Sequence, residues 1–87
     1  MNTDEYQISL AREITVCNNV IARTARELTR LEKKHNMTTA EFVQTAQEKS
    51  NVDTAERSRW LQEYETLRTW QQRLREYEEA LSATRRW

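Results

Sequence analysis

The sequence contains neither glycine nor proline in its 87 residues, although average usage would supply about six glycines and about four prolines in this length. Glycine permits left-handed turns and proline breaks helices, so a chain without either can be helical almost from end to end. The absence of glycine also excludes phosphate-binding glycine-rich loops and the Gly-x-Ser-x-Gly turn of serine hydrolases. We therefore expect an all-α protein that is not an enzyme and needs no cofactor.

Cysteine and long apolar runs are also scarce. The single Cys17 excludes an intrachain disulfide and fits a reducing compartment. No apolar run approaches the roughly 18 residues of a membrane-spanning helix. Asp4 and Glu5 stand where a secretory signal would carry basic residues. These features predict a cytoplasmic protein that does not enter a membrane.

Neither positive nor negative charge predominates. Fourteen basic residues balance fourteen acidic ones, so electrostatic steering toward nucleic acid or an anionic membrane is not expected. Hydrophobic residues make up 37% of the chain, and its mean hydropathy is −1.02. Helices of this composition bury one stripe and expose the rest, and so small a chain usually completes its core by association.

A heptad stripe predicts the first helix, over about residues 3–35. Apolar positions recur at alternating spacings of four and three, which is the a/d pattern of a coiled coil. Asn36 can take the left-handed position that ends such a helix. The stripe consists of Leu10, Ile14, Cys17, Ile21, Thr24, Leu28 and Leu31.

Capping residues predict two further helices, over about 38–49 and 53–85. Thr38 and Glu41 have the spacing of a capping box, and Met37 and Phe42 flank it as a hydrophobic staple. Asp53, with Glu56 three residues later, predicts a similar start for the last helix. The whole chain is then one domain, a long antiparallel hairpin with a short intervening helix that completes a helical bundle by dimerisation.

Large apolar side chains line the last helix over an arc of roughly 160°, which is wider than a two-helix seam requires. We assign part of this stripe to the hairpin or dimer seam and part to a partner interface, while intrachain core remains an alternative for the latter. The seam comprises Leu10, Ile14, Cys17, Ile21, Leu28, Leu31, Trp60, Tyr64 and Leu67. The partner interface comprises Trp70, Leu74, Tyr77 and Leu81, with Arg73 at its rim.

Three other features are weaker candidates for function. Glu32 and His35 have the Glu-x-x-His spacing of di-iron bundles, but one histidine at a helix end predicts no metal site. Cys17 lies in the seam, where it acts as a small hydrophobe. The helix after Thr38 offers Gln44, Gln47 and Lys49 to DNA with one positive charge, which makes nucleic-acid binding an unfavoured third function.

The segment Lys34-His35-Asn36-Met37-Thr38-Thr39-Ala40-Glu41-Phe42, followed by Trp60-Leu61, resembles a family of short bacterial and archaeal helical proteins that are encoded beside small toxins and regarded as antitoxin-like. The resemblance spans roughly residues 31–62. Its pattern is a Tyr-Gly-Met-[Ser/Thr]-x-x-Glu-Phe turn before a Glu-Trp-led helix. Here His35-Asn36 replaces Tyr-Gly, and Arg59 replaces the glutamate before Trp60.

Together these observations predict a non-catalytic protein–protein interaction module. The resemblance implies an antitoxin-like or inhibitory protein that masks the surface of one protein partner. The alternative is a structural, homo-oligomeric coiled coil in which the chain pairs only with itself.

Overall fold

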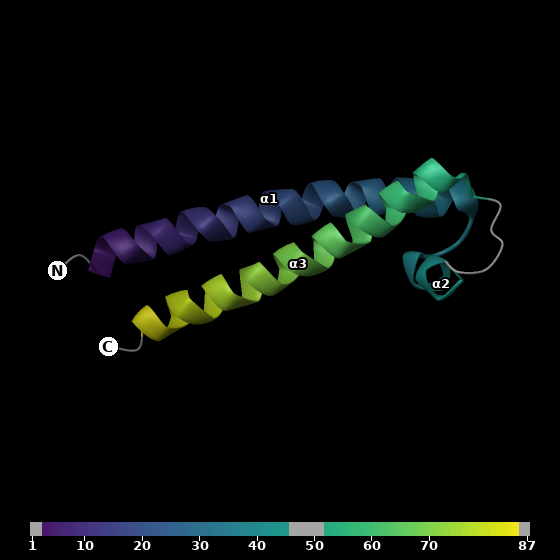
Figure 1. Ribbon diagram of the computed structural model, residues 1–87. Coiled ribbons are helices and arrows are strands. Elements are labelled where there is room, and N and C mark those ends of the chain that lie inside the picture. The colour runs from purple at the N-terminus through teal and green to yellow at the C-terminus, as the bar shows by residue number, and fades with distance from the viewer. Residues whose placement is uncertain (1–2, 46–51, 86–87) are drawn as a thin grey trace.

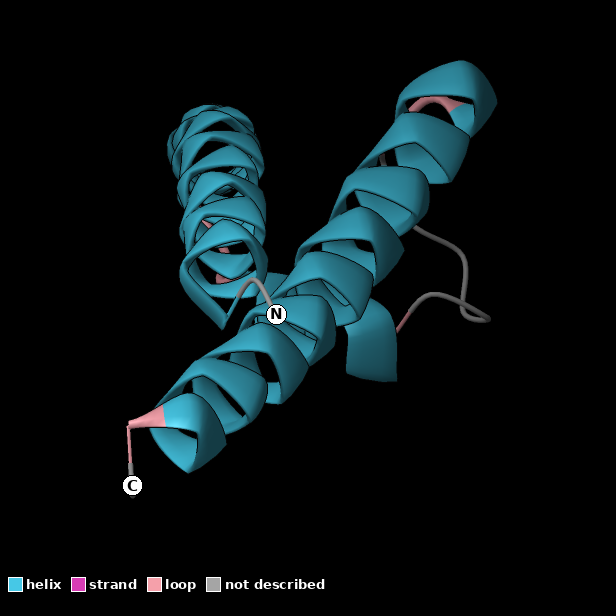
Figure 2. Ribbon diagram, turned by 90° about the vertical axis from the view of Figure 1, so that its left-hand side faces the viewer, coloured by secondary structure: helices cyan, strands magenta, loops and turns pink. Residues whose placement is uncertain are grey.

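The computed structural model describes residues 3–45 and 52–85. Helix α1 runs from Thr3 to His35, α2 from Thr39 to Gln44, and α3 from Thr54 to Thr84. The two long helices lie antiparallel, and α2 is folded against the end at which they are connected (Figure 1). All the elements are helices (Figure 2). The predicted all-α hairpin with a short intervening helix is therefore confirmed.

The molecule is a rod. Its principal extents are 57 × 18 × 18 Å and its radius of gyration is 17.3 Å, whereas a compact chain of this length has a radius of about 12 Å. The first residues of α1 and the last residues of α3 lie at the same end, far from α2 (Figure 1). We refer to this as the open end and to the opposite one as the loop end.

Asn36 ends α1 as predicted. Its φ of 51° is in the left-handed region, which asparagine tolerates better than most residues other than glycine. The next amide, of Met37, donates to the carbonyl of Glu32 at 3.1 Å, which is the 6→1 bond of a Schellman motif. The chain can therefore reverse direction here without glycine.

Thr38 caps α2 as predicted, because its hydroxyl oxygen accepts from the amide of Glu41 at 3.1 Å. The same hydroxyl lies 3.2 Å from the Glu41 carboxylate, to which it donates. Helix α2 ends at Gln44 and is followed by Thr45 as its C-cap, so it is shorter than the predicted helix over 38–49. The remainder of that prediction falls on residues 46–49, outside the described part of the chain.

A compact core fills the loop end. Its buried members are Leu28, Leu31, Phe42, Val52 and Trp60. The rings of Phe42 and Trp60 stack with centroids 4.0 Å apart and planes at 4°, an arrangement in which both rings lose most of their contact with water. Trp60 is completely buried, so α2 serves mainly as a cover for this indole.

The polar groups of this core are also satisfied. The indole Nε1–H of Trp60 donates to the hydroxyl of Thr39 at 3.1 Å, and the amide of Thr39 donates to the carboxylate of Glu32 at 2.7 Å. A buried indole without a partner would carry a desolvation cost. The chain Trp60–Thr39–Glu32 thus connects all three helices.

The predicted side-chain cap of α3 is not formed. Asp53 occupies the N-cap position but makes no side-chain capping bond. Glu56 instead accepts hydrogen bonds from Lys34 at 3.0 Å and pairs with His35 at 3.0 Å, both on α1. These bonds lower the pKa of Glu56, with the His35 bond as the larger cause. The carboxylate therefore joins the two long helices instead of capping one.

Candidate partner-binding surface

Polar pairs at both ends show the register of the hairpin. At the open end Gln7 Nε2 donates to Thr84 Oγ1 at 3.2 Å, and at the loop end His35 Nε2 lies 3.0 Å from Glu56 Oε1. In each pair the two residue numbers add up to 91. In two antiparallel helices that pack without a shift, the residue numbers of facing residues have a constant sum, because the numbering rises along one helix while it falls along the other.

This register places the predicted partner residues opposite the seam of α1. Trp70 is at the level of Ile21, and Tyr77 is at the level of Ile14. Applied to the seam positions of α1, the same sum sets 10 against 81, 14 against 77, 17 against 74, 21 against 70, 24 against 67, 28 against 63 and 31 against 60. The two groups of residues assigned to seam and to partner interface thus lie in one continuous row on α3.

Burial along this row differs between the helices. On α1 the seam residues Leu10, Cys17, Leu28 and Leu31 are buried, whereas Ile14 and Ile21 are half-buried. On α3 only Trp60 is buried. The half-buried residues of the α3 stripe are Tyr64, Leu67, Trp70, Leu74, Tyr77 and Leu81. A single facing helix does not cover these wide side chains on both sides. The half of α3 nearer the open end, which we call its open half, therefore keeps apolar surface in water.

Arg73 is exposed and lies over this surface. Its guanidinium carbon is 4.6 Å from the centroid of the Trp70 ring, within the range of a cation–π interaction. The arginine therefore shields one face of the indole in the unbound chain. A partner that packs on Trp70 would have to accommodate or displace this side chain.

Cys17 behaves as seam rather than as a reactive thiol. Its side chain is completely buried, and burial is the main cause that raises the pKa of the thiol, followed by the charge of Glu13. A thiolate is the reactive form of cysteine. The structure thus places Cys17 where its size matters for packing and its nucleophilicity is suppressed.

The Glu32–His35 pair has structural partners. Glu32 accepts from Thr39, and His35 pairs with Glu56 while its ring stacks on Trp60 with centroids 5.4 Å apart. Within residues 3–45 and 52–85, no three His, Cys, Asp or Glu side chains are grouped so that they could hold a metal ion. No helix in the same ranges is long and apolar enough to cross a membrane.

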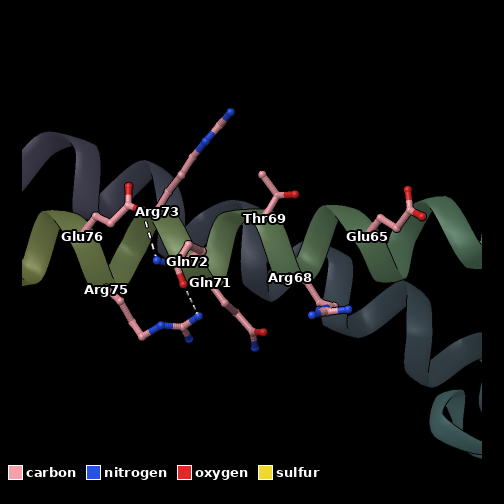
Figure 3. A pocket seen from close by; sticks show the side chains of 8 residues that line it. All are labelled: Glu65, Arg68, Thr69, Gln71, Gln72, Arg73, Arg75 and Glu76. Carbon is pink, nitrogen blue, oxygen red and sulfur yellow. Dashed lines mark hydrogen bonds between the residues drawn. The ribbon is translucent and has the colours of Figure 1, made fainter.

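A shallow hollow on α3 is polar and lies on one helix only. Its eight lining side chains all project from α3, while α1 passes behind it (Figure 3). Gln72 donates to Glu76 at 3.1 Å and accepts from Arg75 at 2.6 Å, so these side chains are already paired with one another. Such an open, polar surface does not enclose a ligand and does not extend the apolar surface of the α3 stripe.

The DNA-facing residues of the third hypothesis are only partly described. Gln44 is exposed at the end of α2, which leaves it accessible. Gln47 and Lys49 lie outside the described residues. The nucleic-acid hypothesis therefore remains an untested and unfavoured prediction.

Sequence reasoning missed the polar members of the seam. Glu56 and His35 continue the three-and-four spacing at the loop end, as Gln7 and Thr84 do at the open end. A search for apolar residues at this spacing stops at the outermost apolar residue of each stripe and overlooks these four polar residues. Extending the heptad by one position in each direction would have found all four.

No family model, no curated protein and no solved structure matches this chain. The resemblance to antitoxin-like proteins consequently stays a prediction.

Proposed function

We propose that this protein is a non-catalytic protein-interaction module whose open half packs against a helix of a protein partner. The partner would cover the half-buried stripe formed by Trp70, Leu74, Tyr77 and Leu81. Arg73 would move from the Trp70 ring to the rim of the interface. This is a helix-in-groove mode of recognition, in which apolar residues at three- and four-residue spacing provide the anchors.

The supporting observation is the amount of surface that the isolated chain exposes. Its accessible area is 6674 Å², whereas a compact monomer of this mass would expose about 5,400 Å². The difference, about 1,200 Å², exceeds the roughly 800 Å² that one partner contributes to an interface of standard size. Together with the half-buried aromatic residues of α3, this excess favours a protein that completes its core on binding.

The antitoxin-like resemblance suggests what such binding would achieve. A small toxin would be inhibited if the open half of α3 occupied an apolar part of its surface. The proposal needs no reaction by this chain, since masking a surface requires only affinity and shape.

The test is to purify tagged protein from its native cells, identify any stoichiometric partner by mass spectrometry, and reconstitute the complex from purified components. Trp70→Ala combined with Tyr77→Ala should weaken binding by more than about 100-fold, as expected when two aromatic anchors are lost. Helicity measured by circular dichroism should persist, because the loop-end core is untouched.

Two further variants keep the result interpretable. Arg73→Glu changes an exposed rim residue without removing seam volume, so reduced affinity with unchanged unfolding would support the interface. Ile8→Ala, at an exposed position of α1, should bind as the unmodified protein does. A purified chain that recovers no stoichiometric partner, or a double variant that binds normally, would refute the proposal.

A further inference from the structure

A second row of residues runs along α1 beside the hairpin seam. Its members recur at spacings of three and four, so they share one face of the helix. At the loop end the row borders α3, because Glu27 pairs there with Arg59 at 3.4 Å. The row consists of Tyr6, Ser9, Glu13, Val16, Val20, Arg23, Glu27 and Arg30.

The centre of this row is apolar and accessible. Val16 is 44% exposed and Val20 is half-buried. Tyr6, at the open end of the row, is 52% exposed. Exposed apolar residues scattered singly are ordinary on a protein surface. Here two valines one turn apart lie on the same face, with charged residues on both sides of them.

The row is complementary in shape and charge to a second copy of itself that runs in the opposite direction. Pairing residues whose numbers add up to 36 sets Val16 against Val20 and Glu13 against Arg23. The same rule sets Tyr6 against Arg30, whose guanidinium is held by Glu27 at 2.8 Å. An antiparallel pair of identical helices has this geometry, in which residue i meets residue j and residue j meets residue i.

Charge complementarity supports the same occupant. Among the described residues neither Glu13 nor Arg23 takes part in a salt bridge, although both belong to a chain rich in opposite charges. A second copy related by a two-fold axis would bring each of them an opposite charge, twice per dimer. No two like charges stand directly opposite each other in this register, in which the remaining pair sets Ser9 against Glu27.

We propose that a second copy of this chain docks antiparallel on this row of α1, with the two-fold axis between Val16 and Val20. The four valines of the pair form the apolar centre, and two Glu13–Arg23 ion pairs flank it. The Tyr6 ring of each copy lies against Arg30 of the other. This surface is distinct from the α3 stripe assigned to a protein partner, so the proposed dimer does not depend on that assignment.

The decisive experiment is a charge swap followed by sedimentation over a range of protein concentrations. Glu13→Arg alone, or Arg23→Glu alone, brings like charges together at both ends of the apolar centre. Each should raise the dimer dissociation constant by at least about tenfold at low salt. The double variant Glu13→Arg, Arg23→Glu restores opposite charges and should return to within about threefold of the unmodified chain.

Salt and matched apolar variants provide independent readouts. At 1 M salt, where the Debye length is about 3 Å, the difference between the single variants and the unmodified chain should shrink. Val16→Arg should abolish dimerisation, whereas Ile8→Arg, at an even more exposed position on another face of α1, should not. Circular dichroism checks that each variant remains helical.

Three results would overturn the proposal: an unmodified chain that stays monomeric at about 100 µM, far above the dissociation constants of specific dimers; single charge variants that dimerise normally; or a double variant as impaired as the singles combined. None of these outcomes bears on the α3 stripe, which is tested by reconstitution with a partner.

Discussion

Thr24 provides the sharpest prediction about stability. It lies at a seam position of α1, its side chain is 1% exposed, and its hydroxyl has no hydrogen-bond partner. Burying an unpaired hydroxyl costs about 1–3 kcal/mol in proteins. Valine has the same branched shape and nearly the same helix propensity, so it would remove the polar atom with little change in packing. Thr24→Val should therefore stabilise the fold by about 1–3 kcal/mol.

Urea unfolding measures this gain directly. The midpoint should rise while the slope m stays the same, because the area exposed on unfolding does not change. In thermal unfolding each 1 kcal/mol corresponds to a rise of about 4–8 °C for a domain of this size. Every comparison should be made at one protein concentration, since association would add its own contribution.

Thr29→Val is the matched control. The Thr29 hydroxyl is exposed and donates to the carbonyl of Ala25 at 2.9 Å. Its replacement should change stability by no more than about 0.5 kcal/mol, as is usual at the surface. A neutral or destabilising Thr24→Val would refute the reasoning, since it would mean that the Thr24 hydroxyl is satisfied in solution.

Three further predictions concern buried and charged side chains along the hairpin. Trp60→Ala should cost about 3–5 kcal/mol in urea unfolding, and Tyr77→Ala clearly less, because Tyr77 is only half-buried; equal losses would contradict the observed asymmetry. The lowered pKa of Glu56 means that its contribution to stability is complete above its ordinary pKa of 4.5 and is lost as pH falls through the lowered value. Unfolding of Glu56→Gln should therefore depend less on pH below 4.5 than that of the unmodified chain. Cys17 should react with a thiol reagent at least about tenfold more slowly in the folded chain than in denaturant, and equal rates would show that the seam opens.

Local features of the fold could be predicted from the sequence. The left-handed Asn36 and the Thr38 cap depend on hydrogen bonds that close within one turn of chain, so their residue types and spacing suffice to locate them. The heptad stripe of α1 likewise follows from helical periodicity, and two of its residues, Leu28 and Leu31, are buried in the loop-end core. The absence of glycine and proline determined the fold class before any packing was considered.

The stripe of α3 shows where sequence reasoning stops. Its breadth indicated apolar surface in excess of a two-helix seam, but not how that surface is divided between α1 and a partner. The division depends on the register in which α1 and α3 pack, which the bonds between Gln7 and Thr84 and between His35 and Glu56 show. Each of these bonds joins residues at least 21 positions apart in the chain.

Contacts between residues distant in the sequence also explain why Glu56 bonds to α1 instead of capping α3. Its spacing from Asp53 favours a capping box, but Lys34 and His35 at the end of α1 lie within hydrogen-bond distance of its carboxylate. Charge-assisted bonds to Lys34 and His35 outweigh a local cap that depends on one neutral amide. Local chemistry thus determined where each helix begins and ends. Only the approach of α1 to α3 decided which polar groups join them and how much of α3 remains exposed, because those energies exist only once both helices are in place.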